Sequence, residues 1–448
     1  MEAVRLYSSR GAGIRDCSLI QDGNLRGERI LSKLSIVGLG PLRGEVCVGG
    51  AKNAALKMLV ACLLTDDECI IHNVPRIKDV EVMLEVLRFL GCDADFCGAH
   101  SVRVRAEGDL GFKAPDVLVR KMRASIQVMG PLLARLGKVQ VAYPGGCAIG
   151  ERPIDIHLAG FAALGADIGE KEGYILAEAG KLVGCEFYLD FPSVGATENL
   201  IMAGVLAQGQ TVLHNVAKEP EIVDLQDFLN KMGAKVMGAG TDRITIQGVE
   251  RLSGTEHWVI PDRIEAGTFM LAGAITKGDV YVRHANVHHL EALQAKLLQS
   301  GVALSSTPDG IWVRAGRAML QPLNLRTMPY PGFPTDLQPQ MMAFLCTVAG
   351  TSMIIEGVYA HRMKHAAELR RMGASIWVEG RSAIIQGGNP LTGASVQASD
   401  LRAGAALILA GLAACGTTEV YGLEHIDRGY EHLESKFQEL GACITRLP

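Results

Sequence analysis

Hydrophobic and polar positions follow a pattern that repeats six times along the chain. Each repeat contains an amphipathic segment with apolar residues at three- and four-residue spacing, as in residues 79–90 and 221–232, which predicts a helix. A glycine follows each segment, where a left-handed residue is favoured. Successive glycines are separated by 74, 68, 68, 72 and 68 residues, which indicates a repeated supersecondary unit. They are Gly91, Gly165, Gly233, Gly301, Gly373 and Gly441.

Three further elements recur around these amphipathic helices. A long helix rich in Ala and Leu begins each repeat, for example at residues 52–64 and 401–414. A β-branched strand follows in five repeats, and an alternating hairpin such as residues 374–388 usually closes the unit. The second repeat is expected to differ, because the glycine-rich residues 144–157 replace a plain strand. The pattern predicts α/β modules, and six of them favour two domains, since single cores rarely exceed about 250–300 residues.

Composition limits the classes of function. The chain has 448 residues, 48% of them hydrophobic, and 44 Lys and Arg against 48 Asp and Glu give a net charge of −4. This make-up is typical of a globular protein, and with only 5% aromatic residues it argues against a nucleic-acid binder. The most apolar stretch, residues 403–418, is 16 residues long and falls short of the ~18–20 that a bilayer requires. The first 30 or so residues resemble a polar extension without a signal peptide.

Cysteine usage points to a reducing compartment. The chain has eleven cysteines and no CxxC motif, and Cys62, Cys346 and Cys415 stand among apolar residues, which predicts buried, reduced thiols in a cytoplasmic protein. Cys147 is the exception, because it lies in a glycine-rich loop near Arg152. A neighbouring cation would lower the pKa of an exposed thiol and make it a usable acid or nucleophile, although a structural cysteine in a turn fits equally well.

Motifs of several enzyme classes are missing. The sequence has neither GxxxxGK[ST] nor GxGxxG after a strand, so nucleotide hydrolysis and hydride transfer are disfavoured. No His/Asp pairing marks a protease-like triad, and no metal-ligand spacing is present. We therefore expect no metal and no cofactor.

Charged residues are expected at the starts of the six apolar helices. Helix N-termini carry free N–H groups and a partial positive charge, so several of them facing one cleft would bind anions. Lys52, Arg123, Arg152, Arg402 and Arg428 would complete a site for several phosphates. In the alternative reading the acids are helix caps and the basic residues are solvated. The expected starting residues are Lys52 with Asn53, Arg123, Thr197 with Glu198, Glu265, Asp336 and Arg402.

A set of ordered motifs from about residue 35 to the C-terminus resembles one family. They include GGAKNAAL (49–56), NVPRIKDV (73–80), PGGCAIGERPIDIH (144–157), FPTDLQPQ (333–340) and HIDRGYE (425–431). In these the chain is similar to the UDP-N-acetylglucosamine 1-carboxyvinyltransferases, a family of enolpyruvyl transferases.

The resemblance implies a two-domain inside-out α/β barrel of six βαβαββ repeats, three per domain, with the active site in the cleft between the domains. One domain would comprise residues 52–260. The other would be discontinuous, with residues 32–51 and 261–448. Residues 1–31 would be an N-terminal extension, expected to be disordered and outside the resemblance.

The family's reaction transfers the enolpyruvyl group of phosphoenolpyruvate to the 3′-hydroxyl of UDP-N-acetylglucosamine and releases phosphate. This reaction opens peptidoglycan precursor synthesis and is the target of fosfomycin. The resemblance therefore implies two small-molecule substrates and no cofactor. It implies no nucleic acid, no membrane and a cytoplasmic location.

The resemblance also implies roles for individual residues. Cys147 would donate a proton and hold phosphoenolpyruvate covalently, and Asp336 would be the base. Cations for the phosphate and carboxylate would come from Lys52, Arg152 and Arg428, with help from Arg402, while Asn53 would touch the tetrahedral intermediate. The nucleotide sugar would be bound by Arg123, Arg152, Pro153, Ile154, Asp155, Ile156, Ser193, Val194 and Gly195, with Val358 near the sugar.

Some positions depart from the family's pattern. An ENRFMH-like segment reads AHRMKH at residues 360–365, where Arg362 is retained. Glu151 replaces a small residue beside Arg152, and Phe191 stands where some members have Lys. These departures put local charge, loop closure and sugar contacts in doubt and favour a specialised or second-copy member.

Three alternatives follow from the same residues. A sister enzyme acts on shikimate 3-phosphate, but it lacks the PGGC loop and has Ser-Asn-Arg where this chain has residues 52–54. A non-catalytic paralogue that binds nucleotide sugar would be expected to lose at least one of Cys147, Asp336, Lys52 and Arg428, and all four are present. A repeat scaffold for protein partners would not need charged residues at helix starts.

Overall fold

The computed structural model of the chain describes residues 32–143, 154–316 and 319–448, and only the backbone of residues 120, 121 and 123. Residues 32–448 belong to one unit, and the predicted extension, residues 1–31, lies outside the described part. Within the described residues, no helix has both the length and the apolar character needed to cross a membrane.

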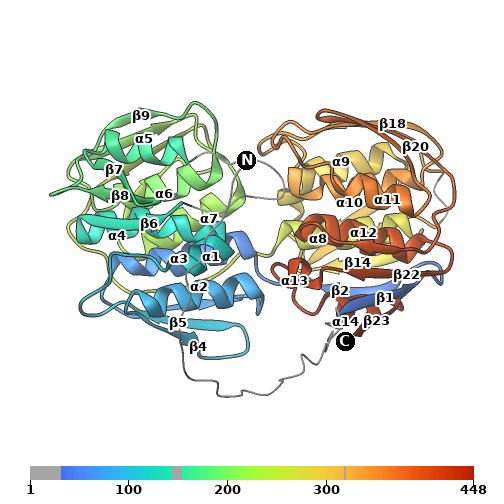
Figure 1. Cartoon of the computed structure of the whole chain (residues 1–448), viewed down its shortest axis with the longest axis horizontal. Coiled ribbons are helices and arrows are strands. Elements are labelled where there is room, and N and C mark those ends of the chain that lie inside the picture. The colour runs from blue at the N-terminus through green and yellow to red at the C-terminus, as the bar shows by residue number, and fades with distance from the viewer. Residues whose placement is uncertain (1–31, 144–153, 317–318) are drawn as a thin grey trace, which may run out of the picture. The chain divides into compact units, whose positions relative to one another are not determined.

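The long apolar helices form the interior of the protein (Figure 1). All nine residues of α10 are buried, as are twelve of the thirteen residues of α8. A helix that is apolar on all sides must be enclosed by other elements, so the sheets and the amphipathic helices lie outside these helices. The central helices are α1 (Lys52–Ala61), α4 (Met129–Leu136), α6 (Val194–Gly204), α8 (Arg263–Ile275), α10 (Gln338–Cys346) and α12 (Leu401–Ala413).

The predicted amphipathic helices are confirmed, and so are the glycines that end them. All six glycines have φ between 85° and 102°, the left-handed conformation that only glycine adopts without strain. The amphipathic helices are α2 (Lys78–Phe89), α5 (Asp155–Ala163), α7 (Pro220–Lys231), α9 (Glu291–Gln299), α11 (His365–Arg371) and α14 (Leu433–Glu439). Shorter helices are α3 (Asp116–Lys121), α13 (Leu423–Ile426) and the 3₁₀ turns η1 (Cys62–Leu64), η2 (Arg123–Val128), η3 (Val287–Leu290) and η4 (Thr335–Leu337).

Five of the six sheets in the described residues share one strand arrangement. Two neighbouring inner strands are antiparallel to each other; one carries a parallel edge strand and the other an antiparallel edge strand. Two of these sheets are β13 (Glu256–Trp258)–β3 (Cys69–His72)–β5 (Ser101–Arg105)–β4 (Asp93–Phe96) and β9 (Glu186–Tyr188)–β10 (Gln210–His214)–β12 (Arg243–Gln247)–β11 (Lys235–Met237). The other three are β2 (Arg43–Cys47)–β14 (Asp279–Arg283)–β16 (Gly310–Arg314)–β15 (Ala303–Thr307), β17 (Asn324–Arg326)–β18 (Gly350–Ile355)–β20 (Ser382–Gly387)–β19 (Ser375–Glu379) and β21 (Ser395–Gln397)–β22 (Thr417–Tyr421)–β1 (Lys33–Val37)–β23 (Cys443–Leu447).

The second repeat differs from the prediction. It contains a regular strand, β6 (Lys138–Ala142), that pairs with the hairpin β7 (Asp167–Lys171)–β8 (Tyr174–Glu178). The expectation that the glycine-rich segment replaces this strand is therefore wrong. Gly137 ends α4 in a left-handed conformation and lets the alternating sequence KVQVA enter the sheet. This sheet has three strands, and an isolated parallel bridge from Lys113 to Gln140 takes the place of a fourth.

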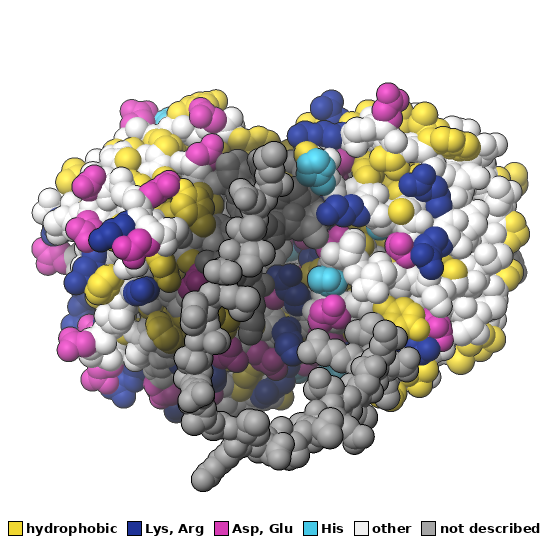
Figure 2. Space-filling model, viewed as in Figure 1, with side chains coloured by type: hydrophobic (Ala, Val, Ile, Leu, Met, Phe, Trp, Pro, Cys, Tyr) yellow, Lys and Arg dark blue, Asp and Glu magenta, His cyan; other side chains and the backbone are white. Residues whose placement is uncertain are grey.

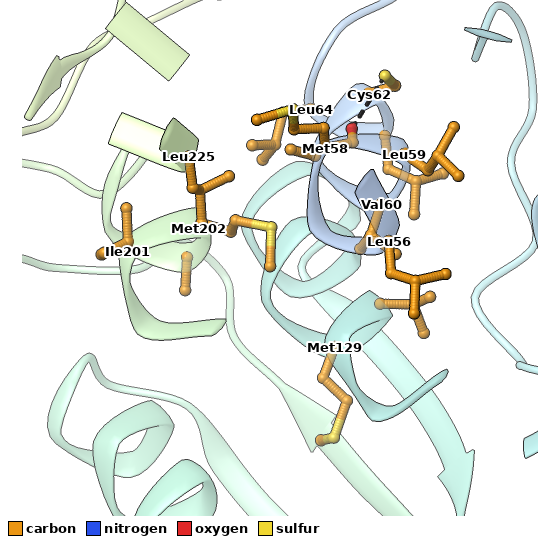
Figure 3. Packing of buried hydrophobic residues seen from close by; sticks show 14 of the residues in the cluster. Leu56, Met58, Leu59, Val60, Cys62, Leu64, Met129, Ile201, Met202 and Leu225 are labelled. Carbon is orange, nitrogen blue, oxygen red and sulfur yellow. Dashed lines mark hydrogen bonds between the residues drawn. The ribbon is translucent and has the colours of Figure 1, made fainter. Parts of the chain in front are cut away.

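Buried apolar side chains form two separate clusters. The first draws on residues 51–259, and the second on residues 34–48 and 264–444. Figure 3 shows part of the first cluster, with labelled residues from α1, α4, α6 and α7 that include Leu56, Met58, Met129, Met202 and Leu225. The division into two domains stays a prediction, and the two clusters are the observation that supports it.

The cysteine prediction holds only in part. Cys62 and Cys346 are buried as expected, and the nine cysteines among the described residues are all free. Cys415 is exposed, so the burial predicted from its apolar neighbours is wrong. It follows Ala414, the extended C-cap residue of α12, and therefore lies beyond the buried helix where the chain turns into β22.

A buried ion pair connects two central helices of the first cluster. Lys57 of α1 and Glu198 of α6 are 2.9 Å apart, and the Glu198 side chain is fully buried. Burial raises the pKa of the Glu198 carboxyl to about 7, although Lys57 opposes this shift. The folded protein therefore binds a proton at pH values where an unfolded glutamate has lost it. Stability contributed by this group is present below the ordinary pKa of about 4.5 and is lost as the pH rises through about 7.

Glu198→Gln should remove this pH dependence. From pH 5 to pH 8 the unfolding free energy of the wild type should fall by roughly 2 kcal/mol relative to that of the variant, because glutamine cannot ionise. Urea unfolding at both pH values measures this difference. Glu250→Gln at an exposed position is the control and should follow the wild type. Parallel curves for Glu198→Gln and wild type would contradict the shifted pKa.

Candidate active site

Lys52, Asp79 and Arg428 form a group of ion pairs, named here the Asp79 cluster. Asp79 Oδ2 lies 2.7 Å from Lys52 Nζ, and Asp79 Oδ1 accepts a hydrogen bond from Arg428 Nε at 2.8 Å. Lys52 and Asp79 are buried, whereas the Arg428 side chain is 38% exposed. Two residues that the sequence placed in the anion site thus meet at one buried carboxylate.

Electrostatics make the Asp79 cluster suitable for an anion. Burial lowers the pKa of Lys52; Asp79 opposes this shift, while Arg402 and Arg428 add to it. Burial alone would raise the pKa of Asp79, but Lys52 and Arg428 hold it below its ordinary value. Two cations thus flank one carboxylate, and a third, Arg402, acts on Lys52, so an added phosphate or carboxylate would be stabilised there.

Backbone contacts position these side chains. Lys52 is the first residue of α1, and its N–H donates to Asp262 Oδ2 at 3.2 Å. Asp262 also caps α8, because its Oδ1 accepts the N–H groups of Ile264 and Glu265 at 2.7 and 3.1 Å. One carboxylate therefore fixes the starts of two central helices. Asp79 lies in the first turn of α2.

Asp336, Arg362 and Arg402 form a second group, the Asp336 cluster. Arg362 Nη2 lies 2.8 Å from Asp336 Oδ1, and Arg402 Nη2 lies 3.0 Å from Asp336 Oδ2. Both arginine side chains are about 5% exposed or less, and Asp336 is 25% exposed. Burial by itself would lower the pKa of Arg402, but Asp336 and then Tyr430 raise it above its ordinary range. The carboxylate is thus held between two fixed guanidiniums.

Residues predicted to bind the nucleotide sugar lie at the starts of two helices. Ser193 caps α6, with its Oγ accepting the N–H of Ala196 at 3.3 Å, and Val194 and Gly195 begin that helix. Gln127 Nε2 donates to the Gly195 carbonyl at 3.1 Å and ties α6 to η2. Further predicted residues lie at the start of α5 and in the loop after β18: Ile154, Asp155, Ile156 and Val358.

Several predicted residues lie outside the described part of the chain. These are Cys147, Arg152 and Pro153, together with the altered residue Glu151. Arg123 is described only by its backbone, which begins η2. In the part of the chain that the structure does describe, no three His, Cys, Asp or Glu side chains are grouped as metal ligands.

One expected helix start is wrong. Thr197 and Glu198 do not begin α6, which starts at Val194 after the Ser193 cap, and both side chains are buried. Thr197 Oγ1 accepts the N–H of Ala217 at 3.1 Å, and Glu198 pairs with Lys57. The remaining expected residues do lie in the first turns of helices or 3₁₀ turns: Lys52, Arg123, Glu265, Asp336 and Arg402.

Sequence reasoning missed Asp79 as a member of the site and left the role of Arg362 open. A signal for Asp79 was present, because it shares the apolar face of its helix with Met83 and Val86, where a buried acid requires a partner. In the altered segment, residues 360 and 361 are exposed, while Arg362 keeps its ion pair with Asp336.

Asp79→Asn should test the Asp79 cluster without any turnover. We expect the free energy of unfolding to be about 3 kcal/mol lower in the variant, because two partly or fully buried cations lose their carboxylate. Inorganic phosphate should then stabilise the variant more than the wild type, since the Asp79 carboxylate no longer competes with phosphate for the two cations. Thermal unfolding with and without phosphate measures both effects. Asp95→Asn, an exposed acid paired with Arg88, is the control and should cost less than about 1 kcal/mol. Equal phosphate protection in wild type and Asp79→Asn would contradict an anion site here.

Comparison with known proteins places the chain in a family. Residues 36–437 match the family model of EPSP synthase (3-phosphoshikimate 1-carboxyvinyltransferase). UDP-N-acetylglucosamine 1-carboxyvinyltransferase 1 of Carboxydothermus hydrogenoformans is 52% identical over 418 residues, which cover 93% of this chain and 99% of that protein. The chain belongs to the UDP-N-acetylglucosamine 1-carboxyvinyltransferase family. UDP-N-acetylglucosamine 1-carboxyvinyltransferase 1 of Staphylococcus aureus (strain N315) is 54% identical, over 93% of this chain and 100% of its own length.

Solved structures agree on the architecture of the chain. The enolpyruvyl transferase NikO from Streptomyces tendae superposes with a TM-score of 0.84 at 25% identity, over 93% of this chain and all of that one. EPSP synthase from Acinetobacter baumannii superposes with a TM-score of 0.74 at 19% identity, over the same shares. The predicted fold class, an inside-out α/β fold of βαβαββ repeats, is confirmed.

Proposed function

We propose that this protein moves the enolpyruvyl group of phosphoenolpyruvate to the 3′-hydroxyl of UDP-N-acetylglucosamine. The observation that carries the proposal is identity above 50% to carboxyvinyltransferases of this name over more than nine-tenths of the chain. The cations and the carboxylate that such a reaction needs are present in the Asp79 and Asp336 clusters. The reaction would be the first committed step of peptidoglycan precursor synthesis.

The reaction is an addition followed by an elimination. The 3′ oxygen bonds to C2 of phosphoenolpyruvate, the 3′ proton goes to a base, and a proton is delivered to the methylene carbon. Phosphate then leaves C2, and the new methyl group loses a proton to restore the double bond. Each step moves a proton at a carbon or oxygen, so a positioned acid and a positioned base set the rate.

Phosphoenolpyruvate brings two anionic groups to the site. Lys52 and Arg428 would bind its phosphate, and Arg402 would reach its carboxylate. Guanidinium groups bind phosphate and carboxylate through two parallel hydrogen bonds. Arg152 would add a further cation, and Asn53, next to Lys52 in α1, would touch the tetrahedral intermediate.

Asp336 is the proposed base. Its two oxygens contact Arg362 and Arg402. An anionic substrate that draws Arg402 toward itself would remove this guanidinium from Asp336 Oδ2, the oxygen proposed to take the 3′-hydroxyl proton. Binding of phosphoenolpyruvate would in this way activate the base for the second substrate.

Cys147 is the proposed proton donor, and its thiol could also hold phosphoenolpyruvate covalently. Both roles come from the match of the PGGC loop to the family. The nucleotide sugar would lie against Arg123, residues 152–156 and the start of α6 at Ser193, Val194 and Gly195, with Val358 near the sugar. Free N–H groups at the start of α6 favour a diphosphate.

We propose two domains, residues 52–260 and residues 32–51 with 261–448, each built on one of the two apolar clusters. The substrates are small anions, and we place the reaction in the cytoplasm. Figure 2 shows that the visible face carries both acidic and basic side chains. We propose no nucleic acid as a partner.

Phosphate release from phosphoenolpyruvate tests the proposed acceptor. Purified protein is incubated with UDP-N-acetylglucosamine or with shikimate 3-phosphate, the acceptor that the name of the family model suggests. Release only with the nucleotide sugar supports the proposal. Release only with shikimate 3-phosphate contradicts it, and no release with either acceptor in a folded protein favours a nucleotide-sugar-binding paralogue.

A further inference from the structure

Glu356 is a buried carboxylate that no role in the reaction yet explains. It directly follows β18 and is 1% exposed. Both its oxygens lie 3.0 Å from Thr335 Oγ1, and its Oε1 accepts the N–H groups of Val358 and Tyr359 at 2.9 and 3.1 Å. Burying a carboxylate is costly unless hydrogen bonds offset the lost hydration, and here a hydroxyl and two backbone N–H groups offset it.

Glu356 fixes the orientation of the Thr335 hydroxyl. A hydroxyl has one proton to donate, and the carboxylate can only accept, so Thr335 donates to Glu356. The lone pairs of Thr335 Oγ1 are then free for Arg362, whose Nη1 donates to Oγ1 at 3.1 Å. The Nη2 atom of the same guanidinium contacts Asp336 Oδ1 at 2.8 Å. A continuous chain of hydrogen bonds therefore runs from Glu356 through Thr335 and Arg362 to Asp336.

A second branch from Glu356 converges on the same guanidinium. The two N–H groups that Glu356 accepts shape the loop that carries Val358 and Tyr359. The Tyr359 ring centroid lies 5.5 Å from the centre of the Arg362 guanidinium, within the range of a cation–π interaction. Glu356 thus supports Arg362 from two sides and connects it to Val358, the proposed sugar contact.

We propose that Glu356 is a positioning residue that fixes Arg362, and through it the Asp336 carboxylate, relative to the loop that contacts the sugar. The inference rests on the proposed role of Asp336 as the base. Glu356 itself does not touch the reacting atoms. Arg402 of α12 and Arg263 of α8 also act on Asp336, and neither is among the hydrogen-bond partners of Glu356.

Two variants separate the branches. Glu356→Gln keeps the size of the side chain and one oxygen for the backbone N–H groups. Its amide N–H₂ now faces Thr335 as a donor and competes with Arg362 for the hydroxyl oxygen. Thr335→Val replaces only the hydroxyl with a methyl group, whereas Thr335→Ser keeps the hydroxyl. Glu379→Gln, at an exposed position in β19 of the same sheet, is the matched control.

The expected result is a shift in pH dependence together with slower turnover. In Glu356→Gln and Thr335→Val, kcat should fall about 10- to 100-fold, because a misplaced reacting group costs that much. The acid side of the kcat–pH profile should move to higher pH, because Asp336 loses a fixed guanidinium. The affinity for UDP-N-acetylglucosamine should change less than the turnover does. Thr335→Ser and Glu379→Gln should follow the wild type.

A pH profile that stays at the wild-type position in both folded variants would overturn the inference, because it would leave Glu356 with a purely structural role. If the wild type releases no phosphate, the proposed function fails separately, and crystal structures of the two variants then decide the inference. Arg362 displaced from Asp336 in these structures supports it, and an unchanged contact overturns it.

Discussion

Asp336→Asn is expected to lower the rate of phosphate release by about a thousandfold, the size of effect associated with loss of a general base. Asparagine has nearly the shape of aspartate and offers its oxygen to one guanidinium, but it does not accept a proton at neutral pH. The site would then bind both substrates without removing the 3′ proton. Titration calorimetry should find the affinity for UDP-N-acetylglucosamine within a few-fold of the wild type.

The control for this variant is Asp309→Asn. Asp309 is exposed and pairs with Arg283, so the variant loses one paired carboxylate away from the site. It should keep wild-type turnover. Rates within about tenfold of the wild type in Asp336→Asn would exclude this residue as the base, given the 10²–10⁴-fold contribution expected of one.

Lys52→Gln is expected to lower kcat/KM for phosphoenolpyruvate by about a hundredfold or more, because it removes a buried cation from the proposed phosphate site. Glutamine can still donate a hydrogen bond to Asp79, but the positive charge is lost. The departing phosphate gains charge during elimination, so kcat should fall together with kcat/KM. Binding of UDP-N-acetylglucosamine in the absence of phosphoenolpyruvate should be nearly unchanged.

Lys181→Gln at an exposed position provides the comparison and should leave both constants unchanged. Steady-state kinetics with phosphoenolpyruvate varied at saturating nucleotide sugar separates the two effects. A Lys52→Gln protein with a normal kcat/KM for phosphoenolpyruvate would remove the Asp79 cluster from the proposed phosphate site.

The repeat architecture could be predicted because it depends on local rules. Each of the six glycines ends a helix and adopts the left-handed conformation that its position in the pattern required. The strand of the second repeat was missed because the conspicuous glycine-rich residues 144–157 were assigned to the place of the strand. The preceding KVQVA already alternates and pairs as a strand.

The site could be predicted only where charge and a helix start coincide. Lys52 and Arg402 lie at the starts of α1 and α12, and the sequence pattern located both. Asp79 and Glu356 were missed because their partners lie far away in the sequence. Asp79 binds Arg428, 349 residues further along, and Glu356 acts through Thr335, 21 residues before it. Only the folded chain brings such pairs together.

Thr197 and Glu198 illustrate the opposite error. Polar residues beside a long apolar segment suggested a helix start, but Ser193 is the better cap and begins α6 one turn earlier. The two residues then lie inside the helix, where Glu198 needs Lys57 as a partner. A capping residue four positions upstream was the available signal.

Identification of the product tests the central claim most directly. The protein is incubated in D₂O with phosphoenolpyruvate and UDP-N-acetylglucosamine, and the purified nucleotide sugar is examined by NMR spectroscopy and mass spectrometry. An enolpyruvyl ether at the 3′ oxygen, with deuterium in its methylene group, is the result that addition followed by elimination predicts. Unmodified UDP-N-acetylglucosamine, or phosphate released together with free pyruvate, would contradict the account.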